Sequence, residues 1–220
     1  MAPVREIPIG TRSLTGRHAR SGARYESGLE RDFYELMTQD PLFDRVDWQP
    51  LHVQYVAANG MKRVYTPDAL VFFRADPVTG IAPRPLLVEV KYRDEYRERF
   101  WELKARLRAA RWHAKSMGWR FAVFTEREIR TVRFANRRML NGFIDRHPCQ
   151  EYLGGLSDRL RQSGPLPVRS LLEAISADLW TQAAILPTLW WMVGHGGLEA
   201  DLDTPLTMQS TVWLPHGEIL

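Results

Sequence analysis

Residues 64–91 read VYTPDALVFFRADPVTGIAPRPLLVEVK, and this stretch decides the expected fold. Both ends are rich in β-branched, aromatic and leucine residues, whereas the middle is rich in Asp, Pro and Gly turn formers. The pattern predicts two strands joined as a hairpin. Asp68 lies in the first arm, and Glu89 and Lys91 lie in the second, where a period of two puts them on one face.

The residues around Glu89 are leucines and valines, which indicates a strand that is covered on both sides. Buried charges cost several kcal/mol unless they are paired or bind a metal. A divalent cation held by Asp68 and Glu89, assisted by the carbonyl of Val90, would remove that cost, and Lys91 can orient or deprotonate a water. The alternative is an ordinary Glu-Lys pair on a solvated face, against which the apolar neighbours argue.

These residues resemble a known family. Thr66-Pro67-Asp68 followed by Glu89-Val90-Lys91 resembles the PD-(D/E)xK signature of the restriction-endonuclease-like nucleases. Further segments resemble TnsA, the family of endonuclease subunits of heteromeric transposases. Those segments are Glu26-Ser27-Gly28-Leu29-Glu30, Phe124-Thr125-Glu126 with Ile129-Arg130, and Asp201-Leu202-Asp203-Thr204-Pro205-Leu206.

The resemblance implies a Mg²⁺-dependent DNA endonuclease, with Mn²⁺ as a substitute metal, that cleaves the 5′ strands at transposon ends. It implies the DDE transposase TnsB as the enzyme that cuts and joins the 3′ strands, and the AAA+ regulator TnsC as a partner of the carboxy-terminal part. Two alternatives remain open from the residues. One is a free-standing restriction or repair nuclease, and the other is a DNA-binding adaptor with a silent site.

Glu30 lies in an expected helix that begins after Ser27, a good N-cap residue, and that carries Leu29 and Phe33 on its apolar face. Glu30 three residues after Ser27 is a capping-box pattern, so it can serve only the helix cap. In the family that the chain resembles, the acid of this first helix completes the metal site. The resemblance therefore implies Glu30 as a fourth catalytic residue and a metal ligand.

The expected fold class is α/β (α+β). Residues 46–56 form an alternating strand with a bulge or edge at Pro50, and Asn59-Gly60 supplies a hairpin turn. The sheet thus opens with three antiparallel strands. A helix over residues 95–117, a strand over 121–126 and a helix over 128–146 follow. This order matches a restriction-endonuclease-like core, with a mixed sheet flanked by helices.

Basic side chains follow one face of the expected helix over residues 95–117 and recur in the amino-terminal arm. Solvated helix faces are usually mixed in sign, so this basic face favours contact with DNA phosphates over a plain solvated face. The basic residues of the amino-terminal arm either contact DNA phosphates as well or have no function. The expected DNA-binding residues are Arg24, Arg97, Lys104, Arg108, Arg111 and Lys115.

Charge and composition divide the chain further. The net charge is +4, but residues 170–220 contain six acids and no Lys or Arg, which leaves +10 for residues 1–169. We expect a basic flexible arm over residues 1–24, the nuclease domain over 25–150, and an acidic winged-helix-like domain over 151–220. Because residues 170–220 lack Lys and Arg, this part is expected to bind a protein partner rather than duplex DNA.

Two helices are expected in the last domain, over residues 170–180 and 187–193, the second with Pro187 at its first position. Trp190 and Trp191 belong either to the partner surface or to the core. No apolar run is long enough to span a bilayer and no secretory segment is present, so a cytoplasmic protein is expected. Cys149 is the only cysteine, which excludes an intramolecular disulfide and a zinc cluster.

Overall fold

The computed structural model describes residues 16–17, 24–25 and 27–215. They form two compact units, one up to Arg130 and one from Thr131 onward. This division differs from the boundary expected near residue 150, because helix α5 (Val132–Ile144) packs against helix α8 (Leu179–His195). Most of the basic arm expected over residues 1–24 lies outside the described residues.

The first unit combines a sheet with helices. Its elements in chain order are β1 (Gly16–Arg17), β2 (Arg24–Tyr25), α1 (Gly28–Thr38), β3 (Phe43–Trp48), β4 (Val53–Val56), β5 (Lys62–Tyr65), β6 (Ala69–Phe73), β7 (Leu86–Val90), α2 (Arg93–Glu98), α3 (Phe100–Ser116), β8 (Arg120–Phe124) and α4 (Glu126–Ile129).

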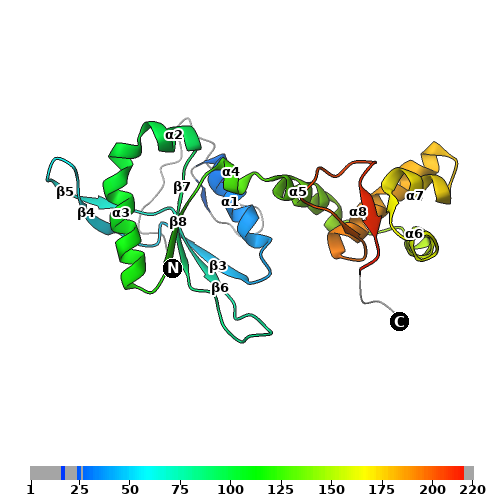
Figure 1. Ribbon diagram of the computed structural model, residues 1–220, viewed down its shortest axis with the longest axis horizontal. Helices are drawn as coiled ribbons and strands as arrows, with labels where there is room; N and C mark the ends of the chain where they lie inside the picture. The colour runs from blue at the N-terminus through cyan, green and yellow to red at the C-terminus, as the bar shows by residue number, and fades with distance from the viewer. Residues whose placement is uncertain (1–15, 18–23, 26, 216–220) are drawn as a thin grey trace. The chain divides into compact units, whose positions relative to one another are not determined.

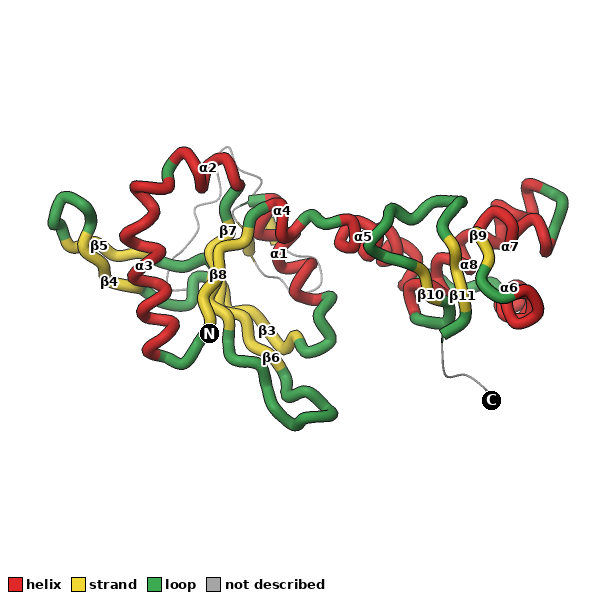
Figure 2. The backbone as a smooth tube through the Cα atoms, in the orientation of Figure 1, coloured by secondary structure: helices red, strands yellow, loops and turns green. Residues whose placement is uncertain are grey.

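The central sheet has four strands in the order β3-β6-β7-β8 (Figure 2). Strands β3, β6 and β7 are antiparallel, whereas β8 runs parallel to β7. All five residues of β7 are buried, as expected for a central strand that is covered on both faces. The predicted hairpin and the mixed sheet flanked by helices are therefore present, and they fit an α+β nuclease fold.

Each face of this sheet is covered by different elements (Figure 1). Leu29 and Phe33 of α1 pack on one face together with Ile129 of α4. Leu103 and Leu107 of α3 pack on the other face, beside the β4–β5 hairpin. Full burial of each such side chain stabilises the unit by about 1.5–3 kcal/mol. Strand β7 is thus fixed between two cores.

Several expected elements are divided in the structure. The strand expected over residues 46–56 splits into β3 and β4, which pair in separate sheets, because Gln49 has a φ of 45° and Pro50 lacks an N–H for a ladder bond. The first arm of the hairpin likewise splits at Pro67 into β5 and β6. The helix expected over 95–117 is divided at Arg99 into α2 and α3. The helix expected over 128–146 is divided after Ile129 into α4 and α5.

The second unit is mainly helical. Its core contains Leu156, Leu171, Ile185 and Leu189. Within the part of the chain that the structure describes, no helix combines the length and apolarity needed to cross a bilayer. The elements of the second unit are α5, α6 (Gln150–Ser163), β9 (Leu166–Pro167), α7 (Val168–Ile175), α8, β10 (Glu199–Ala200) and β11 (Thr211–Trp213). Its three strands form an antiparallel sheet in the order β10-β11-β9.

Helix α8 differs from its prediction. It begins at Leu179, where Asp178 accepts a hydrogen bond from the Thr181 N–H at 2.7 Å, so Pro187 lies inside the helix and not at its first position. An interior proline costs about 3 kcal/mol, and burial of the apolar side chains on both sides of it offsets that cost. The helix ends at His195, and Gly196 follows it in the left-handed region at φ 78°.

Trp190 is only 6% exposed and belongs to the core of the second unit. Trp191 is partly buried against the same core, and its ring stacks on His195 with 4.0 Å between the ring centroids. The core alternative therefore holds for Trp190. The winged-helix-like arrangement of this unit stays a prediction.

Candidate functional site

Two carboxylates meet where β6 begins and β7 ends. Asp68 directly precedes β6, and Glu89 is close to the end of β7. Ala69 pairs with Val88 in antiparallel register, so the next residues outward, Asp68 and Glu89, lie beside each other. Oδ2 of Asp68 also accepts a hydrogen bond from the Val90 N–H at 2.7 Å. The structure therefore brings together the two carboxylates that the sequence singles out.

The ammonium group of Lys91 is surrounded by oxygen atoms. Its Nζ lies 3.3 Å from Oε1 of Glu89 and 3.7 Å from Oδ2 of Asp68. It also donates a hydrogen bond to the carbonyl oxygen of Val90 at 3.1 Å. Three oxygens from three residues thus converge on one positive charge at the edge of a buried strand.

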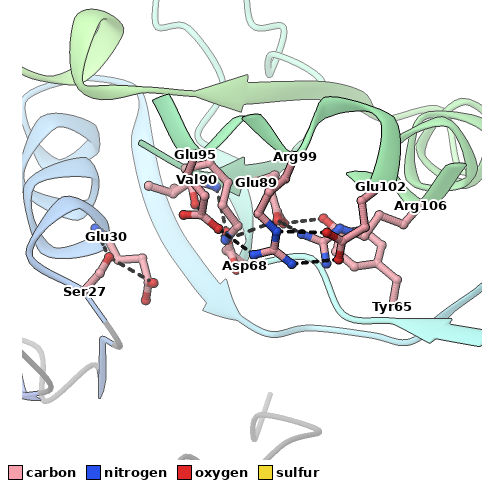
Figure 3. A network of polar contacts seen from close by, with 11 residues as sticks. Ser27, Glu30, Tyr65, Asp68, Glu89, Val90, Glu95, Arg99, Glu102 and Arg106 are labelled. Atoms are coloured by element: carbon pink, nitrogen blue, oxygen red, sulfur yellow. Dashed lines mark hydrogen bonds and ion pairs between the residues drawn. The ribbon is translucent and has the colours of Figure 1, made fainter. Parts of the chain in front are cut away.

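Glu89 is also held by two side chains that the sequence analysis did not single out (Figure 3). Tyr65, at the end of β5, donates a hydrogen bond to Oε2 of Glu89. A guanidinium nitrogen of Arg106 on α3 lies 3.5 Å from Oε1. One signal could have found Arg106: it follows Leu103 by three residues and precedes Ala110 by four, which is the spacing of the buried face of α3.

This environment changes the protonation of the site. Burial, together with the nearby Glu89 carboxylate, raises the pKa of Asp68 to about 7. Burial by itself lowers the pKa of Lys91, but attraction to Asp68 and Glu89 outweighs it and the pKa of Lys91 is raised. Burial and the same two carboxylates also raise the pKa of Tyr65. Lys91 and Tyr65 therefore keep their protons at neutral pH, whereas Asp68 titrates near neutrality.

The donor atoms fit a divalent cation. The oxygens of Asp68, Glu89 and the Val90 carbonyl already surround one positive charge, and hard oxygen donors of this kind suit Mg²⁺. Mg²⁺ is commonly bound by one or two carboxylates and keeps water in its other positions. Among residues 27–215, no three His, Cys, Asp or Glu side chains gather as a metal-binding group. A cation here would therefore rely on the two carboxylates, the carbonyl and solvent.

The sequence predicts two roles for Glu30, in the helix cap and in the metal site, and the structure places its carboxylate beside the capping residue Ser27. The hydroxyl of Ser27 accepts a hydrogen bond from the Glu30 N–H at 3.2 Å and donates one to Oε1 of Glu30, also at 3.2 Å. Figure 3 shows Glu30 on α1 and Ser27 at its start, apart from the group around Asp68 and Glu89. The contribution of Glu30 to metal binding stays a prediction.

The basic face predicted on the long helix is present on α3. Four of its side chains line a groove whose floor includes Phe100 and Phe121. Arg106 lies about 200° around the helix from Lys104, at 100° per residue, so the groove and the carboxylates are on different flanks of α3. Arg97 is exposed on α2, and the side chain of Arg24 lies outside the described residues. The four groove residues are Lys104, Arg108, Arg111 and Lys115.

Comparison with known proteins agrees with the geometry. Residues 43–126 match the protein family described as TnsA-like endonuclease N terminal. The matched residues extend from β3 to the first residue of α4 and include Asp68, Glu89 and Lys91. No curated protein matches the chain. The resemblance to TnsA endonucleases that the motifs predict is confirmed over these residues.

Proposed function

We propose that this chain, whose residues 43–126 carry a TnsA-like endonuclease N-terminal domain, cleaves the 5′ strands at the ends of a transposon in a metal-dependent reaction. The observation that carries the proposal is the convergence of Asp68, Glu89 and the Val90 carbonyl on one cationic nitrogen. Phosphodiester hydrolysis needs such oxygen donors to hold a metal ion beside a positively charged side chain.

The residues of the site have separate tasks in this proposal. Asp68, Glu89 and the carbonyl of Val90 would hold Mg²⁺, or Mn²⁺ as a substitute, since their oxygens already surround a positive charge. The metal ion supplies a Lewis acid that polarises the scissile phosphate and lowers the pKa of a bound water. Lys91 orients the water or the phosphate through its positive charge, which its raised pKa maintains at neutral pH.

The DNA substrate would be contacted by the basic residues on the outer flank of α3. Their exposure favours contacts with the phosphate backbone, which carry affinity rather than sequence preference. Because this flank is not the one that carries Arg106, these contacts would lie away from the scissile phosphate. The proposed DNA-binding residues are Arg24, Arg97, Lys104, Arg108, Arg111 and Lys115.

The second unit would serve protein partners. Leu179 and Trp180 at the start of α8 are 76% and 85% exposed, and large exposed apolar side chains of this kind are typical of interaction surfaces. Residues 170–220, the carboxy-terminal part of this unit, contain no Lys or Arg, which disfavours contact of that part with duplex DNA. The proposed partners are the AAA+ regulator TnsC at this unit and the DDE transposase TnsB at the transposon ends.

Nicking of transposon-end DNA labelled separately on each strand tests this function. In the presence of TnsB and Mg²⁺, wild type should cut the 5′ strand, whereas Lys91→Ala and samples with EDTA should not. Efficient cutting without TnsB would favour a free-standing nuclease of the same fold. Unchanged 5′ cleavage by Asp68→Ala would mean that the site is silent, and the proposal would fail.

A further inference from the structure

The two oxygens of the Glu89 carboxylate contact different partners. The residue is only 2% exposed, so its charge depends on those partners and not on water. Oε2 accepts the hydrogen bond of the Tyr65 hydroxyl. Oε1 faces Lys91 at 3.3 Å and Arg106 at 3.5 Å. The oxygen that faces Lys91 is therefore a different one from the oxygen that Tyr65 binds.

The partners of Glu89 come from elements that are far apart in the sequence. Tyr65 belongs to β5 and is itself only 7% exposed, whereas Arg106 belongs to α3. The guanidinium carbon of Arg106 lies 5.3 Å from the centroid of the Tyr65 ring, so the two side chains support each other. Figure 3 shows them on the same side of Glu89. A rotation of the Glu89 carboxylate would break the Tyr65 hydrogen bond and is therefore opposed.

The charges of this group balance before a metal binds. Asp68 and Glu89 can carry two negative charges, and Lys91 and Arg106 carry two positive ones. Addition of a divalent cation would make the same group positive, which suits a phosphate and the extra negative charge that develops on it during hydrolysis. Arg106 thus has an electrostatic task besides its contact with Glu89.

We infer that Tyr65 is a positioning residue: its hydrogen bond to Oε2 leaves Oε1 of Glu89 on the side of Lys91, where a metal ion would be held. The inference rests on the proposed function, because it concerns how well Glu89 binds the metal ion. Side chains that orient a metal ligand typically change metal affinity by about 10- to 100-fold when they are removed. The Tyr65 hydroxyl is expected to act in this way.

The first test is Mn²⁺ affinity, measured by calorimetric titration of the whole chain. Tyr65→Phe, which removes only the hydroxyl, should weaken Mn²⁺ binding by about 10- to 100-fold. Arg106→Met, which removes a cation from Oε1, should not weaken it. Tyr55→Phe, on the strand paired with β5, and Arg161→Met, an exposed change in α6, are the controls and should bind like wild type. Thermal melting in EDTA reports whether each variant is folded, and Arg106→Lys replaces Arg106→Met if the latter is not.

The second readout is rescue by the metal. If Tyr65 only positions Glu89, a high Mg²⁺ concentration should restore 5′-strand nicking to Tyr65→Phe but not to Glu89→Gln, which lacks the ligand itself. Wild-type Mn²⁺ affinity in folded Tyr65→Phe would overturn the inference and leave the proposed function standing. Absence of Mn²⁺ binding by the wild-type chain, or equal binding by Asp68→Ala, would instead overturn the proposed function.

Discussion

Nζ of Lys91 lies 3.3 Å from Oε1 of Glu89. The ammonium therefore contacts an oxygen that a metal ion would need, as it also does at the Val90 carbonyl. Lysine and metal should thus compete for the same donors, while only the lysine can orient the water or the phosphate.

This competition predicts that Lys91 is needed for strand cleavage but not for metal binding. Lys91→Ala should lose 5′-strand nicking but bind Mn²⁺ at least as tightly as wild type, because the competing ammonium is gone. Glu89→Gln should lose both properties, because a neutral amide is a poor ligand for a hard cation. Calorimetric titration with Mn²⁺ and the strand-specific nicking assay measure the two properties. A loss of Mn²⁺ affinity in folded Lys91→Ala would show that the lysine supports the metal site instead.

The raised pKa of Asp68 predicts how stability depends on pH. Burial and the Glu89 carboxylate raise this pKa from its ordinary 3.8 to about 7 in the folded chain. The proton bound to Asp68 stabilises the folded chain fully below 3.8, the ordinary pKa that applies to the unfolded chain. This stabilisation is lost as pH rises through the folded-state pKa of about 7. In EDTA, the free energy of unfolding of wild type should therefore fall relative to that of Asp68→Asn between about pH 4 and 7. Urea unfolding at several pH values measures this difference, and parallel pH profiles would contradict the prediction.

The basic groove on α3 predicts a salt dependence of DNA binding. Arg108→Gln combined with Arg111→Gln should weaken binding to duplexes of any sequence. It should also reduce the slope of log affinity against log salt by about 1 for each phosphate contact that is lost. Arg161→Gln, an exposed change in α6 of the second unit, serves as the control. Equal slopes for the double variant and wild type would place the DNA elsewhere.

The hydrogen bonds of Asn136 on α5 are predicted to contribute to the stability of the second unit. Its side-chain amide donates to the carbonyls of Leu202 and Thr204 at 2.9 and 2.7 Å and accepts from the Leu206 N–H at 3.0 Å. Asn136→Ala would leave these backbone groups unpaired and should lower the free energy of unfolding by about 1–3 kcal/mol.

Urea unfolding monitored by tryptophan fluorescence checks the prediction for Asn136. Asn141→Ala, at an exposed position of the same helix, is the control. If both variants unfolded at the same urea concentration, the segment around Leu202 would be held by other contacts.

Much of the first unit was predictable because its signals are local. The apolar run before Glu89 predicts a covered strand, and β7 is buried throughout. Ser27 predicts the start of α1, where its side chain accepts a hydrogen bond from the Glu30 N–H. The two carboxylates were found because both arms of one hairpin carry them, so their approach depends on a short stretch of chain.

The features that the sequence did not reveal depend on contacts between distant segments. Tyr65 and Arg106 reach Glu89 from β5 and α3, and neither residue type indicates such a contact without the fold. Pro187 is a strong local signal for a helix start, but burial of the apolar side chains around it places it inside α8. Tertiary burial therefore outweighs the local preference in this helix.

The position of a bound metal ion tests the central claim most directly. Crystals of the wild-type chain grown with Mn²⁺ should give an anomalous diffraction peak within coordination distance of the Asp68 and Glu89 carboxylates and the Val90 carbonyl. Crystals of Asp68→Ala should lack that peak. A Mn²⁺ peak elsewhere in the wild-type chain, or none at these three oxygens while Lys91 still contacts them, would contradict the account.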